Sequence, residues 1–289
     1  MTALISTRPA PTAMRGPMLH PRITVLLRPD GAVQLGLHPE SAVIVSPPGP
    51  VESAPALLRL LDGSRTESEI LWQARELGFD ADIVRALLAQ LTAAGLLETE
   101  RPRSRVRVVR IHGRGPLADA VLAGLRRIGL QAKHSHARCD AGESLGAERP
   151  DLLVFTDALV PDPGLVAALM RRRVPHLPVR LRDGRGIVGP LVLPGETGCL
   201  RCADLHRTDR EPAWPQLAAQ LLGRAGCASP AGVAMTAALT LKEIETISFG
   251  PEERPPATLN ATLELDLDVP HLDRRAWPAH PSCGCCENA

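Results

Sequence analysis

Two tight groups of cysteines constrain the fold of this sequence more than any other feature. Cys199 and Cys202 form the first group, and Cys283, Cys285 and Cys286 follow about 80 residues later. In a reducing compartment, closely spaced cysteines indicate a metal site before they indicate disulfides. Four thiolates at tetrahedral spacing make a closed structural zinc site, so folding must bring the two groups together. Spacing alone allows either Cys285 or Cys286 as the fourth ligand.

Composition argues against several classes of protein. The 289 residues carry a net charge of +1 and are 44% hydrophobic, which is typical of a globular protein with a substantial core. No stretch reaches the roughly 18 consecutive apolar residues of a membrane-spanning helix. The first twenty residues also lack the continuous apolar segment of a secretory signal peptide. We therefore expect a cytoplasmic protein that is neither secreted nor inserted in a membrane.

The sequence divides into three segments. Residues 1–20 are rich in Pro, Ala, Thr and Met without an apolar period, and we expect a mobile tail there. Residues 21–100 predict a three-stranded meander, three helices in close succession and a last strand, an order typical of a winged-helix-like domain. The strands are expected at 23–28, 32–37, 42–46 and 96–99, and the helices at 53–61, 66–77 and 80–94.

The charge of residues 51–100 argues against DNA as the ligand of this domain. Nine acidic residues stand there against four arginines, a net charge of −5. Contacts to phosphate dominate the affinity of proteins for DNA, and the helix expected at 80–94 begins with two aspartates within three residues. The six aromatic residues of the whole chain are also too few for a platform that stacks bases. The sequence therefore predicts no nucleic-acid partner.

A peptide added as an extra strand is the ligand that remains for such a domain. The strand at 42–46 is followed at once by Pro47 and Pro48, so one of its edges is expected to lack a partner. Apolar side chains of the peptide would then enter a groove between this strand and the helix at 80–94. Several of these apolar residues are equally expected to be core. The predicted peptide-binding residues are Ala42, Val43, Ile44, Val45, Ser46, Val84, Arg85 and Leu88.

Residues 101–289 alternate between strand and helix patterns, which predicts an α/β domain of Rossmann type with a mostly parallel sheet. A glycine turn, Gly113-x-Gly115-x-x-Ala118, joins the first strand to the first helix and matches the loose pattern of dinucleotide-binding turns. The second strand, 131–136, lacks the acidic residue that would hold a ribose. We therefore expect the glycines to allow a tight turn and close packing of the helix, and we expect no ATP site.

Three motifs resemble a known family, the truncated relatives of ThiF and ubiquitin-activating enzymes found in azoline-forming peptide biosynthesis. They are called Ocin-ThiF-like or leader-peptide-binding proteins. The resemblance covers nearly the whole chain from Ile23. It rests on GETGCLRCADLHRTDREPAWP at 195–215, the helix from Ser229, and RRAWPAHPSCGC at 274–285.

The resemblance implies a site and a function. Members of the family end in a CGC pair, which favours Cys285 over Cys286 as the zinc ligand, and Asp157 would be a relic of a magnesium-binding aspartate. The chain would bind the leader of a ribosomally made precursor peptide, such as that of a bacteriocin or a thiazole/oxazole-modified microcin. It would present that peptide to a separate YcaO-type cyclodehydratase without catalysing a reaction itself, and it could form a homodimer.

Two other functions remain open. One is an active adenylyltransferase that activates a peptide or carrier-protein carboxylate, which ATP binding would reveal. The other is a winged-helix regulator with a zinc-stabilised sensor domain, which binding to duplex DNA would reveal.

Overall fold

The computed structural model describes residues 15–45, 51–98, 104–135, 149–251, 253–269 and 271–285. The chain separates into two compact units, Met1–Pro102 and Arg103–Ala289. Each unit has its own hydrophobic core. Of the residues singled out from the sequence, Ser46 and Cys286 lie outside the described residues.

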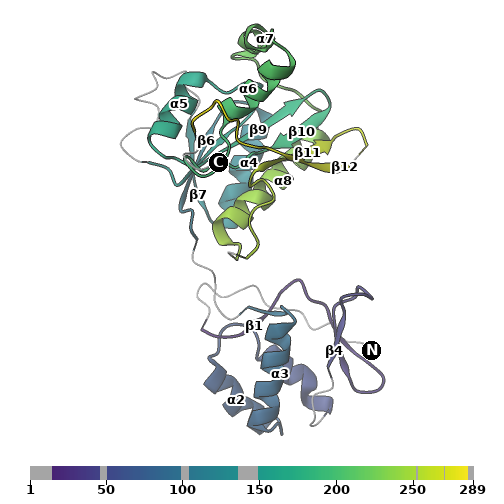
Figure 1. Ribbon diagram of the computed structural model, residues 1–289. Coiled ribbons are helices and arrows are strands. Elements are labelled where there is room, and N and C mark those ends of the chain that lie inside the picture. Colours follow the sequence, from purple (N-terminus) through teal and green to yellow (C-terminus); the bar gives the residue numbers. More distant parts are fainter. Residues whose placement is uncertain are drawn as a thin grey trace. The chain divides into compact units, whose positions relative to one another are not determined.

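The N-terminal unit contains an antiparallel meander and three α-helices (Figure 1). The meander has the order β2-β3-β4, and its strands are β2 (Val25–Leu27), β3 (Val33–Leu35) and β4 (Val43–Val45). The short helix η1 (Val51–Ser53) leads into α1 (Ala54–Arg59), which is followed by α2 (Glu67–Glu76) and α3 (Ala81–Ala93). Leu57, Ile70 and Leu91, one from each α-helix, are fully buried in a core that also includes the inward-facing valines of the meander.

Local sequence explains where the second helix begins. The Thr66 hydroxyl accepts the backbone N–H of Glu69 at 3.3 Å, and the Glu69 carboxylate accepts the backbone N–H of Thr66 at 2.7 Å. The backbone N–H groups of a first helical turn have no partner within the helix, and this reciprocal capping box satisfies two donors at that end. The residue types that form it, Thr66 and Glu69 three positions later, are those typical of a helix start.

A second, two-stranded sheet completes this unit and corrects one expectation. β1 (Met18–Leu19) pairs antiparallel with β5 (Leu97–Glu98), so the last strand of this unit does not extend the meander. Met18 and Leu19 are buried, and the Leu19 backbone N–H donates to Leu61 at 2.8 Å. The mobile tail expected over residues 1–20 therefore does not extend to Met18 and Leu19.

The C-terminal unit is built on a seven-stranded sheet with the order β12-β11-β10-β9-β8-β6-β7. The expected parallel sheet covers only half of it, because β7, β6, β8 and β9 run parallel while β9, β10, β11 and β12 pair antiparallel. The sheet is therefore mixed. Its strands are β6 (Val108–His112), β7 (Gln131–Ser135), β8 (Leu152–Phe155), β9 (His176–Arg182), β10 (Arg185–Val188), β11 (Ala261–Asp266) and β12 (His271–Ala276).

Helices cover the two faces of this sheet differently (Figure 1). α4 (Pro116–Ile128) and α8 (Pro230–Phe249) pack on one face and on each other around the largest core of the chain. α5 (Pro163–Arg171) packs on the other face against Leu153 and Phe155 of β8. α6 (Leu200–Arg210) and α7 (Trp214–Leu221) follow β10 in sequence, and Cys202 of α6 packs with Val192. Within the described residues, no helix combines the length and the apolar character that a bilayer crossing requires.

Candidate functional site

The structure brings four cysteines together from segments more than 80 residues apart. Sulfur–sulfur distances are 3.8 Å for Cys199–Cys202, 3.5 Å for Cys199–Cys283 and 3.3 Å for Cys202–Cys285, and all four atoms lie within 4.8 Å of one another. Disulfide sulfurs are about 2.05 Å apart, so these are four thiols. Four sulfurs held about 2.3 Å from a central ion are separated by about 3.8 Å, which is close to the observed spacing. The group can therefore hold a metal ion.

Burial and mutual repulsion disfavour thiolates at this cluster without a cation. Burial, together with the neighbouring sulfurs, raises the pKa of the Cys199 thiol far above its usual range and that of Cys283 to about 11. Cys202 is fully buried, and Cys283 and Cys285 are partly exposed. Metal ligation requires thiolates, so the charge that favours them here has to come from a bound cation.

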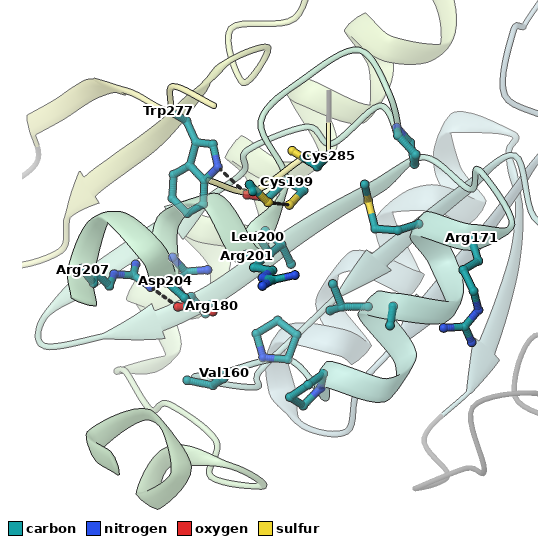
Figure 2. A pocket seen from close by; sticks show the side chains of 18 of the residues that line it. Val160, Arg171, Arg180, Cys199, Leu200, Arg201, Asp204, Arg207, Trp277 and Cys285 are labelled. Atoms are coloured by element: carbon teal, nitrogen blue, oxygen red, sulfur yellow. Dashed lines mark hydrogen bonds and ion pairs between the residues drawn. The ribbon is translucent and has the colours of Figure 1, made fainter. Parts of the chain in front are cut away.

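Backbone contacts hold the segment with Cys199 and Cys202 close to the segment with Cys283 and Cys285. Cys199 is the first residue before α6, and its carbonyl accepts the indole N–H of Trp277 at 3.2 Å, which ties this helix end to the segment after β12 (Figure 2). A Cβ on Gly198 would lie 3.1 Å from backbone atoms of Pro278 and Ala279. Only glycine therefore lets the two segments approach this closely without displacement.

His280 shapes the loop beside the cluster. Its Nδ1 accepts the backbone N–H of Ser282 at 3.1 Å, so its Nε2 carries the proton and donates to Asp209 at 2.9 Å. The His206 ring lies against His280 with 4.6 Å between centroids, and its buried Nε2 has no hydrogen-bond partner among the described residues. The three side chains His206, Asp209 and His280 form a second group whose ligand atoms lie close together. His280 therefore holds the loop that precedes Cys283 through these two hydrogen bonds.

The glycine turn is filled by the protein itself. A Cβ on Gly113 would lie 2.4 Å from the Thr156 carbonyl oxygen, and one on Gly115 would lie 2.7 Å from the Asp157 carboxylate. That carboxylate lies against the backbone N–H groups of Ala118 and Leu117 in the first turn of α4. Such a helix end is where a nucleotide phosphate would bind. The expectation that these glycines allow close packing agrees with this geometry.

Asp157 is buried and has a backbone conformation that is rare for a residue other than glycine. Its backbone φ is 68°, it is only 4% exposed, and its Oδ2 has no hydrogen-bond partner within the described ranges. Burial raises its pKa, and the contacts with the α4 amides offset only part of this effect. On the other side of the turn, the Nε2 of His134 lies 2.7 Å from the Gly113 carbonyl oxygen. His134 belongs to β7, the strand whose end carries a ribose-binding acid in nucleotide-binding folds. The turn is therefore enclosed by an acid and a histidine of the same chain.

The predicted peptide-binding residues separate into two sets. β4 pairs with β3 on one side, and the part of the chain that the structure describes pairs no strand with its other edge. Ile44 is 51% exposed on this strand, and the Arg85 guanidinium is held by Asp82 at 2.6 Å on the exposed side of α3. Val45, Val84 and Leu88 are instead buried in the core. Ala42 and Val43 are half-buried, and Val43 packs partly against the core.

A cavity of about 760 Å³ beside the cysteine cluster was not expected from the sequence. It lies between the segment after β8, the start of α5 and the start of α6, and Cys199, Cys283 and Cys285 belong to its wall (Figure 2). Arg180 of β9 also lines it and is 6% exposed. In the sequence LPVRLR this residue follows the alternation of a strand with one solvated face, so nothing in the pattern indicated its burial.

Comparison with solved structures identifies the fold. A heterocyclase in complex with substrate and cofactor matches with a TM-score of 0.65 and 16% identity over 95% of this chain and 40% of its own. The heterocyclase TruD matches with a TM-score of 0.63 and 18% identity over 94% of this chain and 42% of its own. MccB of E. coli with AMPCPP and selenomethionine MccA matches with a TM-score of 0.60 and 12% identity over 94% and 99% of the two chains.

The chain therefore has the mixed α/β, ThiF-like fold of these enzymes, and it spans about 40% of the length of the heterocyclase chains. At these identities the likeness shows the fold alone. No family model matches the sequence. No curated protein matches it either.

Proposed function

We propose that this chain binds the leader region of a ribosomally synthesised precursor peptide and presents it to a separate YcaO-type cyclodehydratase, which forms azolines from Cys, Ser or Thr. The observation that carries the proposal is the alignment of both units, over 95% of the chain, with a heterocyclase that was solved with its substrate. The cyclisation chemistry is assigned to the partner protein, and this chain acts without catalysing a reaction. We place the complex in the cytoplasm.

In this proposal the N-terminal unit is a winged-helix-like recognition domain of residues 21–100. The leader adds a strand along the free edge of β4, where unpaired backbone groups of an edge strand can accept one. Ile44, Val43 and Arg85 are the side chains left to read its sequence, with Arg85 available to an acidic residue of the leader. Val45, Val84 and Leu88 support this edge from the core.

The proposed C-terminal domain, residues 101–289, has a structural role centred on zinc. Cys199, Cys202, Cys283 and Cys285 are the proposed ligands, since their sulfur spacing fits a tetrahedral ion and a closed set of thiolates is typical of structural zinc. A zinc ion there would join the start of α6 to the segment after β12. We propose no ATP site, because Asp157 fills the turn that a nucleotide phosphate would need.

The second candidate is an adenylyltransferase, and the full-length likeness to an MccB structure with AMPCPP favours it. Calorimetry with ATP and magnesium distinguishes the two. A chain that only presents a peptide gives no saturable heat at about millimolar nucleotide. Micromolar affinity, or pyrophosphate exchange that depends on a peptide, would support the adenylyltransferase instead.

The leader proposal is tested with two proline variants at opposite edges of one sheet. The Gly36 N–H donates to Thr24, and the alternation of the ladder then turns the N–H of Leu26 to Gln34 and that of Leu27 to the outer edge of β2. The same alternation turns the N–H of Ile44 to the free edge of β4. Ile44→Pro removes a backbone donor at the proposed binding edge, and Leu27→Pro removes one at the other edge. The probe is a fluorescein-labelled leader of the short Cys/Ser/Thr-rich peptide expected beside this gene, and anisotropy reports its binding.

We expect Ile44→Pro to weaken binding at least about ten-fold and Leu27→Pro to leave it within about two-fold. Circular dichroism verifies that both variants keep their secondary structure. Equal binding by the two variants would place the leader elsewhere.

A further inference from the structure

Arginine dominates the wall of the cavity beside the cysteine cluster. Its lining includes two carboxylates, Glu196 and Asp204, so the lining residues carry a net charge of +4. In Figure 2, Arg201 stands between Arg171 on one side and Arg180 with Arg207 on the other. The six arginines that line it are Arg171, Arg173, Arg180, Arg182, Arg201 and Arg207.

Arg180 is the buried arginine of this wall, and its charge has no partner among the described residues. Arg182 pairs with Asp183 at 3.6 Å, and Arg207 pairs with Asp204 at 3.2 Å. Arg180 forms no ion pair among the described residues, and its buried Nε has no hydrogen-bond acceptor there. A buried guanidinium without an acceptor is costly, so its presence beside an open cavity needs an explanation.

The nearest acidic residues are already engaged. Glu264 lies on the same face of the sheet, two strands from Arg180, and binds Arg275 at 3.1 Å. Asp204 accepts both the Arg207 guanidinium and the indole N–H of Trp214, the latter at 3.0 Å. Burial, with Arg182 and Arg207 close by, lowers the pKa of Arg180 to about 9. The wall of the cavity therefore includes a buried guanidinium whose Nε the described residues do not satisfy.

The remaining wall has the opposite character. Leu159 and Val160 from the segment after β8, together with Val166 and Met170 of α5, give it an apolar side. Trp214 and Trp277 add aromatic surface. The volume is within the range of about 300–1,000 Å³ that is typical of sites for small molecules. Ligands of open α/β sheets also bind at the carboxyl ends of parallel strands, and Leu159 and Val160 follow such an end, that of β8.

We propose that this cavity is a binding site for a small organic acid, whose carboxylate or phosphate group binds Arg180 and whose apolar part packs against Leu159, Val160 and Met170. The planar fork of a guanidinium matches two oxygens of either group. The inference uses only residues of the C-terminal unit and does not depend on the leader-binding proposal. In this proposal the C-terminal unit binds an organic acid, separately from the peptide that the N-terminal unit is proposed to bind.

Intrinsic fluorescence can test the proposal, because two of the three tryptophans of the chain line the cavity. The probes are N-acetyl-leucine, its neutral analogue N-acetyl-leucinamide, and phenyl phosphate, each titrated into the full chain. We expect saturable binding of at least one anion and none of the amide. The stronger of the two anions identifies the oxyanion that the site prefers.

Arg180→Met tests the assigned residue, and Arg126→Met on the exposed side of α4 is its matched control. We expect Arg180→Met to weaken binding of the anion at least about ten-fold, and Arg126→Met to leave it unchanged. Arg180→Met should melt no lower than the wild type, because it removes a buried charge without a partner. Arg180→Lys, which keeps the charge and loses the fork, decides the outcome if the methionine variant does not fold.

Three results would overturn the proposal. They are equal binding of acid and amide, no binding of either anion, and unchanged affinity in the Arg180 variants.

Discussion

The glycine turn and the arginine cavity are two places in one α/β unit where an anion could bind, and they differ in how the protein treats them. At the turn, the Asp157 carboxylate lies against the first amides of α4, so the chain supplies its own anion. At the cavity, the buried Nε of Arg180 is left without an acceptor by the residues that the structure describes. A motif that resembles a ligand site is filled, and a strand without any motif carries the unsatisfied donor.

The comparison suggests that an anion site is better indicated by an unsatisfied buried donor than by a glycine pattern. A glycine-rich turn requires only that backbone segments approach closely, and Gly113 meets that requirement against Thr156. A buried donor without a partner costs free energy in every molecule of the protein, and an anion bound beside it would recover part of that cost.

The largest expected loss of stability comes from replacing Cys199, which belongs both to the cysteine cluster and to the lining of the cavity. Cys199→Ser removes one of four thiolates that the proposed zinc ion needs, so metal and stability should be lost together. We expect well under one zinc per chain by elemental analysis and a free energy of unfolding lower by about 5 kcal/mol.

Cys227→Ser is the control for this variant, because Cys227 is exposed and outside the cluster. It should keep both the metal and the melting temperature. Purified wild-type protein without bound zinc would contradict the proposed metal site.

A smaller loss of stability should come from adding a side chain at the glycine turn. Gly113→Ala would place a Cβ 2.4 Å from the Thr156 carbonyl oxygen, and a backbone atom cannot move aside cheaply. We expect a loss of about 3 kcal/mol in the free energy of unfolding, measured by urea titration.

Gly129→Ala, at the other end of α4, is the matched variant. Gly129 also has a positive φ, of 84°, but nothing lies within 4 Å of its added Cβ, so only backbone strain remains, about 1 kcal/mol. If the two variants lose the same stability, the turn is not packed as tightly as the structure has it.

The smallest of the three losses of stability is expected from protonation of His176, which lies on β9, the strand that also carries Arg180. His176 of β9 is fully buried, its Nδ1 donates to the Val174 carbonyl at 3.0 Å, and burial lowers its pKa to about 4. Since an unfolded histidine titrates near 6.5, the unfolded state takes up a proton that the folded state does not between these two values. Stability contributed by His176 is therefore complete above pH 6.5 and is lost as the pH falls toward 4.

Urea titrations at pH 7 and pH 5 should show this contribution as a loss of roughly 2 kcal/mol in the wild type. His176→Gln should lose less over the same interval, because no buried imidazole remains to be charged. His38→Gln, which replaces an exposed histidine, should leave the wild-type pH dependence in place. An identical dependence in His176→Gln and the wild type would assign the acid sensitivity to other groups.

Local signals predicted the elements whose ends are set by single residues. The helix expected after the glycine turn is α4, which begins at Pro116 because proline fits a first helical turn and ends at Ile128 because Gly129 adopts the left-handed conformation. The four clustered cysteines were also found from spacing, although spacing could not choose between Cys285 and Cys286. The structure places Cys285 in the cluster.

Features that depend on tertiary contacts were missed. β12 has the sequence HLDRRA, whose mostly exposed polar residues carry no strand alternation, and it is held by pairing with β11. The antiparallel half of the sheet depends on how loops return the chain, which hydrophobic patterns do not encode. The burial of Arg180 and the fit of Asp157 into the glycine turn likewise require several segments to be in place at once.

The separation of the two cysteine pairs along the sequence sets how early the cluster can form during synthesis. A ribosome that adds roughly 5–20 residues per second needs about 4–16 s to make the segment between Cys202 and Cys283. During that interval the first two thiols have no partners from the second pair, and Trp277, which anchors the carbonyl of Cys199, has not been made. The cluster can therefore close only after β11 and β12 have been synthesised. Oxidants or competing metals that reach the nascent chain encounter a half-built site, so the yield of correctly assembled protein depends on how fast this segment is translated.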